Sequence, residues 1–267
     1  RALRAAGHRT GRYTSPHLLS LRERFAVDGT PVSDVEMLDA VDTVRRTVEQ
    51  LRANGTLDVH PTFFEVTTAV AFELFRRRGV EVAVCEVGLG GRLDATNVLL
   101  PVGCAITTIG FDHQQYLGTT LGDIAFEKAG ISKRGMTVVC GDLPDEAQRV
   151  IDAVGAARGA HIVDSRRDVR VDATMSDGRA RATFATTASG LSSARDALHS
   201  RTGAACTRLI VNMPAPTAGS VERTIARSSF WRRMPAWTPL AMNPFGAVTL
   251  TGTSSRTDRN WSNRDSL

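Results

Sequence analysis

The chain has 267 residues, 42% of them hydrophobic, which is enough apolar material for one large domain or two small ones. Its net charge of +5 is uneven: residues 1–185 carry 23 basic and 24 acidic side chains, whereas residues 186–267 carry 10 and 4. Because the basic excess belongs to the second segment alone, the charge does not predict a nucleic-acid-binding face on the folded body. No apolar run approaches the ~20 residues of a membrane span, so we expect no membrane partner.

Segments typical of strands and helices alternate through residues 1–185. In chain order the pattern predicts the end of a helix at 1–6, a strand at 8–14, a strand end at 25–27, helices at 33–53 and 62–78, strands at 80–87 and 103–110, a helix at 121–129, a strand at 136–140, a helix at 145–157, a strand at 161–163, and a hairpin of 169–171 with 182–184. The strands at 80–87 and 103–110 lack polar alternation, as strands covered on both faces do. We therefore predict an α/β domain with a parallel sheet.

Residues 186–267 have a different composition. They contain 22 serines and threonines, no lysine and few acids, and we find no sustained helical or strand period in them. We predict a tail that is either of low order or of non-native sequence.

The four cysteines, Cys85, Cys104, Cys140 and Cys206, show no paired spacing of the kind that binds metal. Three of them fall in apolar strand-like runs, which favours buried, reduced thiols and hence a cytoplasmic protein.

Only two lysines, Lys128 and Lys133, stand against 31 arginines. An arginine keeps its charge, whereas a lysine amine can lose its proton and react, for example with carbon dioxide to form a carbamate. Lys128 therefore stands out as a candidate functional group.

Polar side chains follow three of the predicted strands. Ser15, Glu86 and the pair Asp112-His113 each lie at or just past a strand end. Because ligands of α/β sheets gather at the carboxyl ends of strands, these groups and Lys128 predict a divalent-metal and phosphate site. Taken singly, Glu86 is equally well a solvated strand end, and His113 an ordinary surface or core histidine.

The residues after Glu86 form a glycine-rich loop, 88–91, followed by Arg92 and Asp94. Glycines let backbone approach a ligand and offer free N–H groups, although a tight turn explains them equally well. Arg92 and Asp94 could pair with each other or contact a substrate carboxylate. The chain contains no GxxxxGK[ST] phosphate-binding motif.

Together these motifs resemble the central domain of folylpolyglutamate synthase/dihydrofolate synthase, in the Mur ligase superfamily. The matching segments are residues 13–18, 62–65, 86–97, 112–113, 117–121 and 126–131. The resemblance implies a P-loop NTPase-like α/β domain with a parallel sheet. It also implies an ATP-dependent ligase that phosphorylates a carboxylate of dihydropteroate or folate, which the amine of L-glutamate then attacks. We expect a cytoplasmic monomer that needs Mg²⁺.

The resemblance also implies roles for individual residues. Ser15 and Glu86 would bind the magnesium that bridges the ATP phosphates, while His113 and a carbamylated Lys128 would hold a second magnesium and act as the catalytic pair. The substrate-binding residues would be Pro16, His17, Leu18, Arg92, Asp94 and Asn97.

Two family features are not found in the sequence: a phosphate-binding loop with a Gly-Lys-Gly-Ser core, and a C-terminal glutamate-binding domain. We therefore expect a domain truncated at both ends, comprising residues 1–185, that is inactive by itself. Two alternatives remain open: a Mur-type ligase acting on a cell-wall precursor, and a non-catalytic remnant of the fold.

Overall fold

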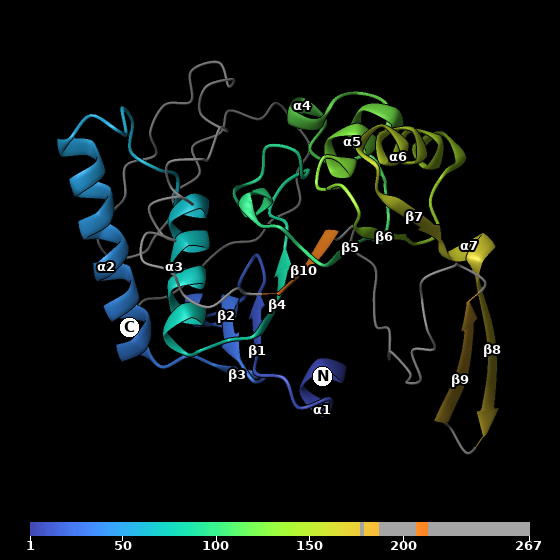
Figure 1. Cartoon of the computed structure of the whole chain (residues 1–267), viewed down its shortest axis with the longest axis horizontal. Coiled ribbons are helices and arrows are strands. Elements are labelled where there is room, and N and C mark those ends of the chain that lie inside the picture. The colour runs from blue at the N-terminus through green and yellow to red at the C-terminus, as the bar shows by residue number, and fades with distance from the viewer. Residues whose placement is uncertain (177–178, 187–206, 213–267) are drawn as a thin grey trace, which may run out of the picture. The chain divides into compact units, whose positions relative to one another are not determined.

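A computed structural model describes residues 1–176, 179–186 and 207–212 of the chain (Figure 1). All of them fall within one compact unit, Arg1–Arg232. None of the described helices is long and apolar enough to cross a membrane.

Within the described residues, the main sheet has eight strands in the order β3-β2-β1-β4-β10-β5-β6-β7. Its strands are β1 (Thr10–Tyr13), β2 (Phe25–Val27), β3 (Thr30–Pro31), β4 (Val82–Glu86), β5 (Gly103–Ile106), β6 (Thr137–Cys140), β7 (His161–Asp164) and β10 (Thr207–Asn212). Strand β1 pairs with β4 in parallel, and β5, β6 and β7 form a second parallel set. The predicted α/β fold with a parallel sheet is confirmed, with β2 and β3 added as an antiparallel edge.

The predicted helices lie close to their expected positions. The described helices are α1 (Ala2–Ala5), α2 (Asp34–Ala53), α3 (Phe63–Arg77), α4 (Gln114–Leu117), α5 (Leu121–Ala129), α6 (Asp145–Arg158) and α7 (Ser165–Asp168), with short 3₁₀ turns η1 (Leu21–Arg24) and η2 (Ala95–Val98). Of these, the two short helices α4 and α7 were not predicted. Helices α2, α3 and α5 each begin with a capping box, in which the N-cap hydroxyl and an acid three residues later satisfy the first free N–H groups. These local signals explain why the helix starts could be predicted.

Burial alternates along the central strands. In β4, Ala83 and Cys85 are fully buried, whereas Val82, Val84 and Glu86 are only partly buried. One face of the sheet thus packs into the core, and the described residues cover the other face only in part. The sequence predicted cover on both faces; it could not distinguish the two cases, because apolar residues occupy both sides of these strands.

Strand β10 corrects the expectation for the tail. It lies antiparallel between β4 and β5, although we predicted no regular element in residues 186–267. The run Leu209-Ile210-Val211 is too short to stand out in a segment of that composition. The rest of the predicted tail, 187–206 and 213–267, lies outside the described residues.

The predicted hairpin is present and longer than expected. Strands β8 (Val169–Ser176) and β9 (Arg179–Thr186) form a separate two-stranded sheet.

Candidate functional site

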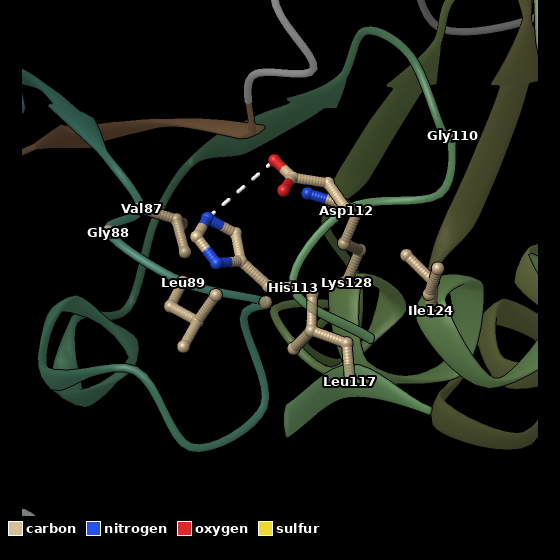
Figure 2. A pocket seen from close by; sticks show the side chains of 10 residues that line it. Val87, Gly88, Leu89, Gly110, Asp112, His113, Leu117, Ile124 and Lys128 are labelled. Atoms are coloured by element: carbon tan, nitrogen blue, oxygen red, sulfur yellow. Dashed lines mark ion pairs between the residues drawn. The ribbon is translucent and has the colours of Figure 1, made fainter. Parts of the chain in front are cut away.

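A pocket lies where the segments that follow β4 and β5 meet helix α5 (Figure 2). Its lining residues are Val87, Gly88, Leu89, Gly90, Gly110, Asp112, His113, Leu117, Ile124 and Lys128. Three of the polar groups singled out in the sequence, those of Asp112, His113 and Lys128, therefore share one cavity.

The loop after β4 is organised around the buried carboxylate of Asp94. Its Oδ2 accepts hydrogen bonds from the backbone N–H groups of Gly88 and Leu89, both at 3.0 Å. Its Oδ1 accepts from the backbone N–H and the hydroxyl of Thr96, at 2.9 and 2.5 Å. Burial raises the pKa of Asp94, and these hydrogen bonds oppose that rise.

These contacts change the interpretation of the glycine loop. The N–H groups of Gly88 and Leu89 are used by Asp94, so they are not free for a phosphate. Asp94 holds the loop in shape, and Arg92 pairs with Glu127 rather than with Asp94.

Arg92 instead joins the loop to α5. Its Nη2 lies 2.7 Å from Oε1 of Glu127, its backbone N–H donates to the carbonyl of Glu127 at 2.8 Å, and its guanidinium lies over the ring of Phe126. At Gly130, just past the helix, an added Cβ would lie 2.2 Å from Cβ of Arg92. Only glycine allows the loop and the end of α5 to approach this closely.

Asn97 completes the same junction. Its Nδ2 donates to the carbonyls of Arg92 at 2.9 Å and of Gly130 at 3.1 Å. The carboxamide is therefore engaged within the protein, like the side chains of Arg92 and Asp94.

The segment after β5 is much more exposed. The side chains of Asp112 and His113 are 69% and 54% exposed, and Nε2 of His113 lies 3.6 Å from Oδ2 of Asp112. His113 has a φ of 49°, a left-handed conformation that a non-glycine residue adopts at some cost. Figure 2 shows its imidazole beside Val87 and Gly88, with the side chain of Lys128 to the right, next to Asp112.

Ser15 and Glu86 form a second group. The backbone N–H of Ser15, which follows β1, donates to Oε2 of Glu86 at the end of β4, at 3.0 Å. The parallel pairing of β1 with β4 brings the two strand ends together, as predicted. Neither residue lines the pocket that His113 and Lys128 share.

The structure thus shows two sets of neighbours among the predicted metal ligands: Ser15 with Glu86, and His113 with Lys128. Within the part of the chain that the structure describes, no three His, Cys, Asp or Glu residues are close enough to hold a metal ion. Asp112, which our ligand set omitted, is the acid nearest to His113. Its position directly before the histidine was a signal available in the sequence.

The predicted substrate segment lies on the surface. Leu18 and Leu19 are 88% and 95% exposed, and their backbone N–H groups donate to the carboxylate of Glu23. Nδ1 of His17 accepts a hydrogen bond from Nε of Arg24 at 3.0 Å, so a neutral His17 carries its proton on Nε2. The guanidinium of Arg24 also lies over the ring of Phe63, a link that nothing in the sequence suggested.

The chain is similar in sequence to enzymes of folate metabolism. It is 42% identical to "Folylpolyglutamate synthase" of Lacticaseibacillus casei over 169 residues, which cover 63% of this chain and 39% of the relative. It is 43% identical to "Dihydrofolate synthase/folylpolyglutamate synthase" of Bacillus subtilis over 150 residues, covering 56% of this chain and 34% of the relative. The chain is thus similar to folylpolyglutamate synthases over more than half of its length. No family model matches it.

Solved structures of folylpolyglutamate synthase confirm the fold. The apo L. casei enzyme has a TM-score of 0.65 at 40% identity, over 69% of this chain and 45% of that one. The Mycobacterium tuberculosis enzyme, complexed with ADP and AMPPCP, has a TM-score of 0.63 at 34% identity, over 68% of this chain and 42% of that one. The chain thus spans less than half the length of these relatives.

Proposed function

We propose that the whole protein is an ATP-dependent ligase that adds L-glutamate to dihydropteroate, to tetrahydrofolate, or to both. The names of its relatives support this, and so do relatives solved with a nucleotide analogue and folate, and with ADP and DHPP. They favour the folate branch over a ligase of cell-wall precursors. The observation that carries the proposal is the pocket in which a buried lysine on α5 lies beside His113 and Asp112.

We propose two magnesium positions that match the two groups of side chains. Ser15 and Glu86 supply oxygen donors of the kind that Mg²⁺ prefers. At the second position, the ammonium of Lys128 would repel a cation, whereas a carbamate on its Nζ would supply two oxygens beside His113. The bound metals would neutralise charge on the phosphates of ATP during transfer.

The residues predicted to bind substrate also fall into two sets, one exposed and one engaged within the protein. We propose that Pro16, His17 and Leu18 face the pterin or folate, because this segment lies exposed next to Ser15. Arg92, Asp94 and Asn97 use their polar groups within the loop, so we propose that they support the site rather than bind substrate.

The carbamate can be tested on the chain itself. Protein equilibrated with ¹³C-bicarbonate should show a carbamate carbon signal that disappears in Lys128→Arg and persists in Lys133→Arg. With only two lysines present, the assignment is direct. A signal unaffected by Lys128→Arg would contradict the proposal.

Activity is tested by incubating the protein with Mg²⁺, ATP, L-glutamate and either dihydropteroate or tetrahydrofolate, and weighing the products by mass spectrometry. Glu86→Ala is the matched control. Two further points stay predictions. The 267-residue chain alone should turn over no substrate, and the enzyme should be a cytoplasmic monomer.

A further inference from the structure

The second lysine of the chain, Lys133, has a defined pair of hydrogen-bond acceptors. Nζ of Lys133 donates to two acceptors of one residue, the Oδ1 of Asn97 at 2.7 Å and its backbone carbonyl at 3.0 Å. The side chain is partly buried. Burial, together with the nearby charge of Arg158, lowers the pKa of Lys133.

This ammonium determines which way the carboxamide of Asn97 points. With Oδ1 toward Lys133, the Nδ2 group donates to the carbonyls of Arg92 and Gly130. A flipped carboxamide would place its N–H groups against the ammonium and its oxygen against the two carbonyls. All of its interactions would then be repulsive.

The two carbonyls that Asn97 joins belong to the loop after β4 and to the end of α5, the helix that carries Lys128. Arg92 belongs to the glycine loop that lines the pocket, and Gly130 follows the helix turn that carries Lys128. From α6, Nη1 of Arg158 donates to the same carbonyl of Gly130 at 2.7 Å and to that of Ser132 at 3.1 Å. The turn after α5 is thus held from two directions.

We propose that Lys133 is a positioning residue: by orienting Asn97 it locks the glycine loop to the end of α5 and sets the place of Lys128 in the pocket. The metal at Lys128 is part of the proposed function, so this inference rests on it. Lys133 itself contacts neither metal nor substrate.

The test compares metal affinity with stability. Mn²⁺, a paramagnetic substitute for Mg²⁺, is titrated in bicarbonate buffer and followed by electron paramagnetic resonance. We expect Lys133→Met and Asn97→Leu each to weaken Mn²⁺ binding at least about 10-fold, and the double variant to be no weaker than either single one, because the two groups act as one unit. Arg134→Met removes a neighbouring exposed cation and should leave the affinity unchanged.

Hydrogen exchange keeps the inference testable if the metal site itself fails. If the wild-type chain binds no Mn²⁺, the proposed metal site is wrong, and the amides decide whether Lys133 holds the loop. The amides of Arg92 and Asn97, which donate to Glu127 and Asp94, should exchange at least about 10-fold faster in Lys133→Met, while those of β6 keep their protection. Wild-type exchange of both loop amides, wild-type Mn²⁺ affinity in Lys133→Met, or an equal loss in Arg134→Met would overturn the proposal.

Discussion

The two strand ends that form the pocket are built in opposite ways. After β4, the loop 88–97 has a buried carboxylate at its centre and is joined to α5 through Arg92 and Asn97. After β5, Asp112 and His113 project from the surface with one long ion pair between them. In the first wall of the pocket, the loop after β4, the polar side chains are paired within the protein. In the second wall, the segment after β5, the Asp112–His113 ion pair is the one contact of these side chains within the described part of the chain.

The difference follows from where each segment finds its hydrogen bonds. A buried carboxylate is tolerated only when its oxygens are satisfied, and Asp94 meets that condition with four donors. An exposed ion pair contributes on the order of 0–1 kcal/mol and cannot fix a loop. The same type of substitution should therefore lower the free energy of unfolding more in the first wall than in the second.

The largest effect is expected at Asp94. Asp94→Ala leaves the donors of Gly88, Leu89 and Thr96 without their acceptor in a buried site, and should lower the free energy of unfolding by about 3–5 kcal/mol. Urea unfolding followed by circular dichroism measures it.

The matched control is Asp112→Ala, which removes the same group from an exposed position and should change stability by less than about 0.5 kcal/mol. Equal losses at the two positions would show that the walls do not differ as described.

The two walls can also be compared by adding a single methyl group to a glycine at each. Gly130→Ala places a Cβ within 2.4 Å of Cα of Arg92 and should cost about 2–4 kcal/mol, because the loop must separate from α5. Gly110→Ala meets no atom within 4 Å and should be nearly neutral. The difference in unfolding midpoint between the variants measures the effect, and a neutral Gly130→Ala would mean that the loop is not held against the helix.

Amide hydrogen exchange in the wild-type chain should also distinguish the two walls. The amides of Leu89 and Thr96 donate to a buried carboxylate, whereas Phe111 and Asp112 lie in an exposed segment. We expect the first pair to exchange at least about 100-fold more slowly than the second. Similar protection in both segments would contradict the contrast.

Most of the fold could be predicted because its signals are local. Capping residues mark the starts of α2, α3 and α5, and apolar runs mark β4 and β5. Strand β10 could not be predicted, because its place depends on the edges of β4 and β5, which lie over a hundred residues earlier in the chain.

Two residues that line the pocket, His113 and Lys128, were singled out in the sequence, one by its position past a strand end and the other by its rarity. Their roles stay predictions. The sequence could not show that Asp94 and Asn97 face inward, since most of their partners, such as Gly88 and Gly130, contribute backbone atoms. Backbone atoms are the same at every residue and leave no mark in a sequence.

The smallest effect on stability, and the clearest on binding, is expected at His113. Its side chain is half exposed, and its one described ion pair, to Asp112, is long, so His113→Ala should change the free energy of unfolding by less than about 0.5 kcal/mol. In the proposed site, however, the imidazole is a metal ligand, so the same variant should weaken Mn²⁺ binding at least about 10-fold. His161→Ala, an exposed histidine of β7 outside the pocket, controls for the loss of an imidazole elsewhere. Destabilisation of His113→Ala by more than about 2 kcal/mol would show that the segment after β5 contributes to the stability of the fold. Unchanged Mn²⁺ affinity would remove His113 from the site.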